Sequence, residues 1–360
     1  METEHSIKKL LSEICEPYTE KTLGEIGAIQ NIEVSNTDIK VTLVFGFPLK
    51  EYEVKLKEMI FSKVKKASEK PIKIDIVSKI TAREAQRGVP TLSQVKNIIA
   101  IASGKGGVGK STTATNLACA ISQEGGSVGI LDADIYGPSQ TKMLGTVGKP
   151  DSLDGKKMEP ITNHGIQSIS IGNLIKEDTP MIWRGPMATG ALEQLLNETN
   201  WRELDYLIVD LPPGTGDIHL TLCQKIPLTG AVIVSTPQDI ALLDAKKALR
   251  MFEKVKVPVL GIIENMSGHI CPKCGHEDNI FGKGGAKKMA SEYSIDVLGS
   301  VPINTNLRQS MDCGKPIVIE DNNSPISQAY FNIGRSITAK ISILNKDFSR
   351  KFPNIVVEDS

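Results

Sequence analysis

A glycine-rich loop directly after a short apolar run constrains this 360-residue chain more than any other feature. The loop, 104–111, reads Gly-Lys-Gly-Gly-Val-Gly-Lys-Ser, which has the G-x-x-x-x-G-K-S spacing of a phosphate-binding loop. Its glycines let successive backbone N–H groups point at one anion, and a helix starting near Lys110 adds its positive dipole end. In this pattern Lys110 reaches the β- and γ-phosphates, and the Ser111 hydroxyl is a ligand of Mg²⁺. The sequence therefore predicts a site for a nucleoside triphosphate.

A second lysine follows the first glycine of the loop. With Lys105 at this position, the loop resembles the deviant Walker A motif of the MinD/Mrp/ParA ATPases. The resemblance implies that Lys105 reaches across a homodimer interface to the partner's ATP, where a cation offsets charge on the phosphoryl oxygens. Lys105 and Lys110 are thus predicted catalytic residues, the alternative for Lys105 being a solvated loop lysine. The nucleotide-binding residues predicted here are Gly104, Lys105, Gly106, Gly107, Val108, Gly109, Lys110, Ser111 and Thr112.

Two carboxylates stand where the apolar stretch 127–132 ends and a turn begins. By resemblance to the same family this is the switch I region. Asp134 is then expected to position the attacking water, and Asp132 to lie nearer the Mg²⁺ shell. A pair of solvated turn aspartates is the alternative.

The octapeptide Asp-Leu-Pro-Pro-Gly-Thr-Gly-Asp at 210–217 follows four apolar residues. Asp210 is suited to holding Mg²⁺, usually through a water. The stiff prolines and permissive glycines suit a switch II loop, in which the Gly214 amide senses a γ-phosphate. The octapeptide resembles the Mrp branch of the family. The stretch 181–187 also resembles that branch, with Trp183 and Arg184 as partner contacts or as a loop anchor.

Another strand-like run ends at Asn265. A side-chain amide is both donor and acceptor, so it can pair with an adenine edge. The family resemblance assigns Asn265 this role in ATP binding.

Cys271 and Cys274 form a Cys-x-x-Cys pair in a loop rich in Gly and Pro. Two thiolates at this spacing bind one metal from a tight knuckle. One pair leaves tetrahedral coordination incomplete, and His276 is a possible third ligand. A homodimer that joins both pairs on its two-fold axis would supply four thiolates, suited to zinc or a [4Fe–4S] cluster.

The Mrp/ApbC family, which the sequence resembles over 97–320, uses this cysteine pair for a bridging, labile iron–sulfur cluster. The alternatives are a structural zinc knuckle and a redox pair, although a redox pair normally opens a helix. Three other cysteines, Cys15, Cys223 and Cys313, are expected to be packed.

The chain divides into four predicted parts. Residues 1–80 form a small α+β domain that resembles the SufT-like domain of iron–sulfur assembly proteins, although the cysteine that often follows its third strand is absent here. Residues 81–96 are a linker, 97–347 are the ATPase domain, and 348–360 are a polar C-terminal tail. In the first part we predict helices at 7–14 and 51–67 and strands at 28–34, 38–45 and 71–77.

From residue 97 onward, apolar runs of strand length alternate with helical stretches. This alternation predicts a P-loop NTPase fold of the α/β class with a mostly parallel, doubly wound sheet, whose ligands lie at the carboxyl ends of the strands. The predicted strands are 97–102, 127–132, 166–171, 205–211, 230–236, 258–264 and 297–301.

The net charge at pH 7 is zero, so no overall basic field favours nucleic acid or an anionic membrane. No apolar run approaches the roughly 20 residues that span a bilayer, and the first residues lack the features of a signal peptide. We therefore expect a cytoplasmic protein without a nucleic-acid or membrane partner.

The resemblance implies a Mg²⁺-dependent ATPase that receives an iron–sulfur cluster from a scaffold protein, holds it in a homodimer and transfers it to apo-proteins. One alternative is a positioning ATPase of the MinD/ParA kind, but the chain ends in a polar, acidic tip instead of a basic amphipathic helix. The other is a nucleotide-dependent adaptor with structural zinc at the cysteine pair.

Overall fold

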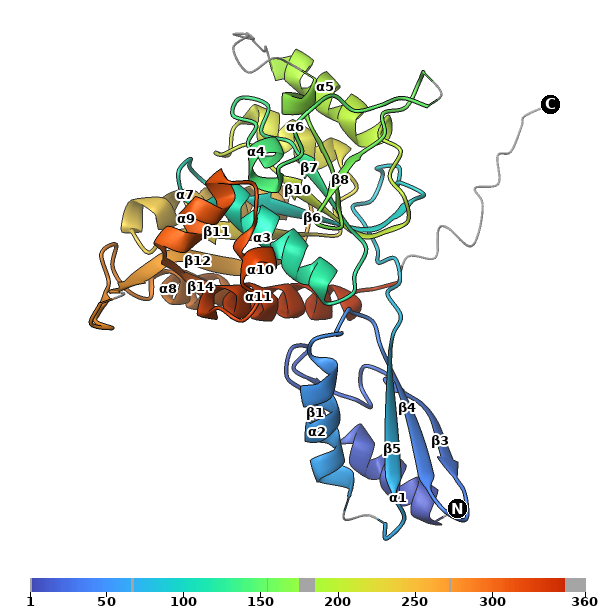
Figure 1. Ribbon diagram of the computed structural model, residues 1–360. Coiled ribbons are helices and arrows are strands. Elements are labelled where there is room, and N and C mark those ends of the chain that lie inside the picture. Colours follow the sequence, from blue (N-terminus) through green and yellow to red (C-terminus); the bar gives the residue numbers. More distant parts are fainter. Residues whose placement is uncertain (1, 66–67, 154, 175–184, 272, 347–360) are drawn as a thin grey trace, which may run out of the picture.

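The computed structural model describes residues 2–65, 68–153, 155–174, 185–271 and 273–346. Its centre is a nine-stranded sheet in which β14, β12, β11, β6, β10, β7, β9 and β8 lie side by side in that order, with β13 paired to the far end of β12 (Figure 1). The strands from β14 to β9 are parallel, and the short strands β8 and β13 are antiparallel. The strands are β6 (Val95–Ala102), β7 (Val128–Asp132), β8 (Ile161–Asn163), β9 (Ile166–Ser170), β10 (Leu204–Asp210), β11 (Gly230–Ser235), β12 (Val259–Ile270), β13 (Glu277–Asp278) and β14 (Val297–Ile303).

All seven strands predicted for this part of the chain are present, and the predicted α/β class is confirmed. β7 and β11 are buried along their whole length, as expected for parallel strands that are covered on both faces. β12 is the exception in length, because it continues to Ile270, beyond its predicted end at residue 264.

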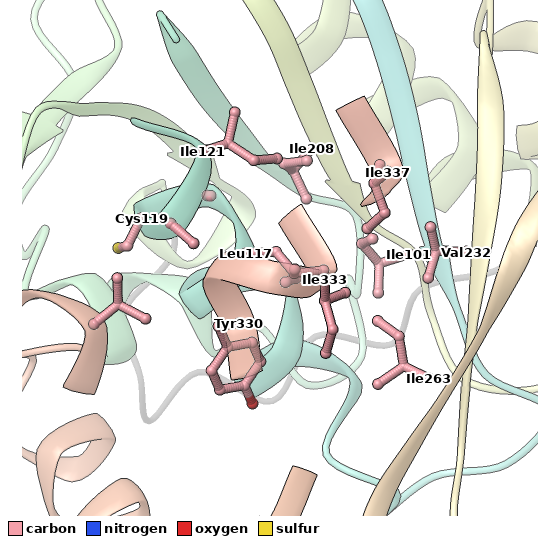
Figure 2. Close-up of a cluster of buried hydrophobic side chains, with 14 of the residues drawn as sticks. Ile101, Leu117, Cys119, Ile121, Ile208, Val232, Ile263, Tyr330, Ile333 and Ile337 are labelled. Carbon is pink, nitrogen blue, oxygen red and sulfur yellow. The ribbon is translucent and has the colours of Figure 1, made fainter. Parts of the chain in front are cut away.

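Helices cover both faces of the sheet. α3 (Lys110–Gln123) and α11 (Pro325–Ser342) pack against one face, where Leu117, Ile333 and Ile337 meet Ile101 of β6 (Figure 2). The opposite face is covered by α5 (Gly185–Asn197), α6 (Asp217–Lys225), α7 (Asp239–Lys254) and α8 (Gly285–Tyr293). The short elements are α4 (Gln140–Leu144), η1 (Ile171–Asn173), α9 (Thr305–Asp312) and α10 (Ile317–Glu320).

The N-terminal unit has its own three-stranded sheet, in the order β3, β4, β5. α2 connects the parallel strands β4 and β5 and buries Leu56, Ile60 and Val64. The elements are α1 (Glu2–Ser12), β1 (Cys15–Glu16), β2 (Lys21–Thr22), β3 (Ile29–Val34), β4 (Ile39–Phe45), α2 (Glu53–Val64) and β5 (Ile72–Ser78).

One prediction for this unit is wrong. Cys15 is exposed and lies in β1, not in a helix within the core. α1 ends at Ser12 because the chain turns there to form the β1–β2 hairpin, so the helix buries Ile7 and Leu11 but does not reach the cysteine.

The N-terminal unit contacts Glu124, at the C-terminal end of α3, through backbone hydrogen bonds, and Glu124 also forms a buried ion pair within the larger part of the chain. Arg335 of α11 pairs with Glu124, and the other oxygen of Glu124 accepts the N–H of Glu51 at 2.9 Å. The Arg335 guanidinium also lies over the ring of Tyr52, 5.3 Å from its centroid. Because α3 begins at the phosphate-binding loop, this helix connects the loop to the N-terminal unit.

Within the described residues no helix is both long and apolar enough to cross a bilayer.

Candidate nucleotide and metal sites

The glycine-rich loop joins the carboxyl end of β6 to the first turn of α3. Gly109 has φ of +81° and caps α3, a backbone conformation that glycine adopts without strain. The Asn265 amide donates to the Val108 carbonyl at 2.8 Å, and a Cβ on Gly109 would lie 2.1 Å from the Asn265 Nδ2 atom. The loop is therefore braced from β12 by a residue whose predicted role was adenine recognition.

Lys110 is buried and faces two carboxylates. Its Nζ atom is 2.6 Å from Oδ1 of Asp210 and 3.6 Å from Oδ2 of Asp134, and 3.3 Å from the Ser111 hydroxyl. Burial raises the pKa of Asp134, and the positive charge of Lys110 partly offsets this effect. The structure thus brings together the residues predicted to bind phosphate, Mg²⁺ and the attacking water.

Asp132 is fully buried and holds the turn that follows β7. Its Oδ2 atom accepts the N–H groups of Ser139 and Gln140, both at 3.0 Å, and the Ser170 hydroxyl at 2.9 Å. Burial, and then the negative charge of Asp210, raise the pKa of Asp132. These contacts describe a residue that shapes the switch I loop, and the predicted place near the Mg²⁺ shell stays a prediction.

The sequence prediction did not include Gln140, which is 1% exposed and lies among these charged groups. Its Nε2 atom donates to Oδ2 of Asp210 at 2.8 Å and to the Ser111 carbonyl at 3.2 Å. A glutamine after a polar turn carries no sequence signal of its own, because its amide finds partners only where α3 and the end of β10 come together.

The loop after β10 contacts the glycine-rich loop directly. The N–H of Gly214 donates to the Ser103 carbonyl at 3.0 Å. His219, another residue that the prediction missed, is buried with Nε2 2.5 Å from the Pro212 carbonyl. Burial lowers the pKa of His219, so a neutral imidazole holds this loop.

Lys105, which precedes Gly106 in the loop, is half-buried. In the part of the chain that the structure describes, its ammonium group forms neither an ion pair nor a hydrogen bond. Among the described residues, this lysine of the glycine-rich loop therefore has no anionic partner. Trp183 and Arg184 lie outside the described residues.

The cysteine pair lies at the tip of the hairpin that β12 and β13 form. The N–H of Cys271 donates to the His276 carbonyl, and the N–H of Gly275 donates to the Cys271 carbonyl, both at 2.9 Å. The backbone N–H groups of Cys274 and Lys273, followed by the Cys274 thiol, lower the pKa of the Cys271 thiol. The backbone hydrogen bonds close a tight turn between Cys271 and His276, and the predicted metal ligation by the two cysteines stays a prediction.

The described residues contain no group of three or more His, Cys, Asp or Glu side chains that could hold a metal ion. Hence His276 does not complete a site with the two cysteines in one chain. The four-coordinate site predicted from the sequence needs ligands from outside the described part of this chain.

The remaining cysteines differ from one another. Cys223 is packed as predicted, and burial raises the pKa of its thiol to about 12. The same prediction is wrong for Cys313, which is exposed. Because α9 ends at Asp312, Cys313 lines a cavity of about 870 Å³ whose wall also includes Ile270, the residue before Cys271.

Comparisons with known proteins place the chain in a family. Residues 94–338 match a family model described as "ParA: NUBPL iron-transfer P-loop NTPase". The chain is 46% identical to an iron–sulfur cluster carrier protein of Haemophilus influenzae, covering 94% of this chain and 92% of that protein. It is 48% identical to the iron–sulfur cluster transfer protein NUBPL of Mus musculus, over 71% of this chain and 82% of that one.

Two solved structures resemble the part of the chain that contains the glycine-rich loop. A nucleotide-binding protein of Archaeoglobus fulgidus, in complex with ADP and with Co found in it, is 39% identical with a TM-score of 0.58, covering 67% of this chain and 93% of that chain. The cell-division ATPase MinD of Pyrococcus furiosus is 21% identical with a TM-score of 0.51, over 67% of this chain and 98% of that chain, which shows the shared fold.

Proposed function

Since the chain belongs to the NUBPL iron-transfer family of P-loop NTPases, we propose that it is an ATP-hydrolysing carrier that binds a [4Fe–4S] cluster as cargo and transfers it to apo-proteins. The observation that carries the proposal is the position of two sites on one strand. β12 supplies Asn265, which braces the phosphate-binding loop, and ends directly before Cys271.

The nucleotide site fits Mg²⁺ by the chemistry of its donors. The Ser111 hydroxyl and the Asp210 carboxylate approach the same cationic group, the Lys110 ammonium, and hydroxyl and carboxylate oxygens are the ligands that Mg²⁺ prefers. Bound there, the ion would supply positive charge that neutralises the phosphates. Lys110 would bind the phosphates, Asp134 would orient the attacking water, and Lys105 would act on the nucleotide of a second copy.

The cargo site requires two copies of the chain. Cys271 and Cys274 supply two thiolates, and a [4Fe–4S] cluster is held by four. A two-fold axis through the hairpin tips would complete the set with the same two residues. The lowered pKa of Cys271 favours the thiolate form that a cluster requires. The same pair would receive the cluster from a scaffold protein and present it to an apo-protein in the cytoplasm.

The test is the metal content of anaerobically purified and reconstituted protein, together with its oligomeric state. We expect about four irons and four sulfides per dimer, lost in both Cys271→Ser and Cys274→Ser and kept in Cys313→Ser. Cys313 is the matched control because it is an exposed cysteine outside the hairpin. Tightly bound zinc that iron does not replace would instead identify the nucleotide-dependent adaptor, since a cysteine knuckle also suits structural zinc.

A further inference from the structure

We propose that Gln140 is a positioning residue for Mg²⁺ binding, because it fixes the carboxylate orientation of Asp210 and links it to the switch I loop. The inference deepens the proposed function and rests on its nucleotide site. It concerns a residue that touches neither phosphate nor metal in the proposed arrangement.

The Gln140 amide has one orientation that satisfies its neighbours. Its Nε2 atom faces two acceptors, the Asp210 Oδ2 atom at 2.8 Å and the Ser111 carbonyl at 3.2 Å. Its Oε1 atom faces the Thr115 hydroxyl at 2.7 Å. A flipped amide would place its oxygen against the Asp210 carboxylate, so the surroundings select the donor for Asp210.

With this contact, each oxygen of the Asp210 carboxylate has its own side-chain partner. Lys110 holds Oδ1 at 2.6 Å, and Gln140 holds Oδ2 at 2.8 Å, so the carboxylate plane is fixed from both sides. When Lys110 turns to a phosphate, Gln140 remains as the described partner of Asp210. Outer partners of a metal-binding carboxylate set its orientation and charge distribution.

The same residue belongs to the switch I loop. The backbone N–H of Gln140 donates to Asp132 at 3.0 Å and its side chain donates to Asp210 at 2.8 Å. One residue therefore ties the turn after β7 to the carboxylate after β10. A neutral amide performs this task without adding a charge to a site that already has three carboxylates.

The experiment measures binding of a fluorescent ADP analogue with and without Mg²⁺, using the full-length protein. Gln140→Met keeps the length of the side chain and removes the donor. We expect the Mg²⁺ concentration for half-maximal effect on nucleotide binding to rise about tenfold, with Mg²⁺-free nucleotide affinity unchanged. The matched control is Gln86→Met, the same substitution at a half-buried amide that bonds to the Val255 carbonyl, and it should not change the Mg²⁺ dependence.

Three results overturn the inference while leaving the proposed function intact. One is an unchanged Mg²⁺ dependence in folded Gln140→Met. Another is a loss of nucleotide affinity that is as large without Mg²⁺ as with it, which a merely structural role would produce. If that variant does not fold, Thr115→Val decides. It removes the partner of Oε1, together with the hydrogen bond from the Thr115 hydroxyl to the Ser111 carbonyl, and leaves the Gln140 donor in place. It should shift the Mg²⁺ dependence in the same direction by a smaller factor. No shift there is the third contrary result, whereas wild-type protein that binds no Mg²⁺-nucleotide contradicts the proposed function itself.

Discussion

The backbone N–H of Gly214 donates to the carbonyl of Ser103 at 3.0 Å, so the switch II loop is bonded to the strand end from which the phosphate-binding loop starts. The same N–H is the group predicted to sense a γ-phosphate. Binding a phosphate at Gly214 would therefore exchange one acceptor for another. This exchange gives the loop two alternative arrangements, which is what a switch requires.

Gly214 adopts φ of +105°, so we expect Gly214→Ala to lower the free energy of unfolding by about 1–2 kcal/mol through backbone strain. Gly216→Ala is the matched control, because Gly216 has φ of −78° and a Cβ there meets no atom within 4 Å. Urea denaturation of both variants measures the difference. Equal free energies of unfolding for the two variants would show that alanine adopts the positive φ at position 214 without strain.

Removing Lys110 should destabilise the fold, because Asp210 would lose its cation while remaining 0% exposed. For Lys110→Met we expect a loss of about 3–5 kcal/mol in the free energy of unfolding. Lys105→Met, the same substitution at a lysine that forms no ion pair with a described residue, should stay within about 0.5 kcal/mol of wild type. A Lys110→Met protein as stable as wild type would contradict the buried pair.

Lys105 should matter for the rate of ATP hydrolysis, although it contributes little to the stability of the fold. Lys105→Met should lower kcat for ATP hydrolysis on the order of a hundredfold, with a small change in the dissociation constant for ATP. The reason is that the proposed contact stabilises charge only during the reaction, in the partner's site. A normal kcat in the dimeric variant would remove Lys105 from the catalytic residues.

The cysteines should react with iodoacetamide in a definite order, because only the thiolate is the nucleophile. Its lowered pKa predicts that Cys271 is alkylated first at pH 7.5, whereas Cys223, with a pKa raised to about 12 and a buried side chain, should react only after unfolding. Peptide mass spectrometry after timed alkylation gives the order. Faster labelling of Cys313 than of Cys271 would count against the knuckle geometry.

Acid should weaken the fold through His219. Burial lowers its pKa in the folded state from about 6.5, so folding favours the neutral imidazole. The contribution of neutral His219 to the free energy of unfolding is complete above pH 6.5. It is lost as the pH falls below 6.5, by at most about 1.4 kcal/mol per pH unit for one proton. Urea titrations at pH 7.5 and 5.5 should show a smaller loss in His219→Gln, and the same loss in both proteins would exclude this group as the cause.

The positions of the strands along the chain were predictable from the sequence, and so was the gathering of charged residues at one sheet edge, whose roles stay predictions. Buried parallel strands read as apolar runs, and chemistry-bearing residues follow them at one sheet edge, as Asp132 and Asp210 do. The loop position of Cys271 and Cys274 was predictable for another reason, because the Cys-x-x-Cys spacing acts locally, and its metal ligation stays a prediction.

Contacts between distant segments were not predictable in the same way. Gln140 meets Asp210 across 70 residues, and Asn265 meets Val108 across 157. A polar side chain in a turn looks solvated until the fold buries it. The wrong predictions for Cys15 and Cys313 have the same origin, because both cysteines lie just beyond the end of a helix, where the chain turns outward.

The far end of β12 has a consequence for how such proteins diversify. Asn265 is the last residue of this strand that contacts the glycine-rich loop among the described hydrogen bonds, and the cysteine hairpin begins only after Ile270. The proposed cluster site therefore lies beyond the part of β12 that contacts the glycine-rich loop. Replacing the hairpin would change the proposed cargo without changing any residue of the proposed nucleotide site, so in such proteins the two sites can vary independently in sequence.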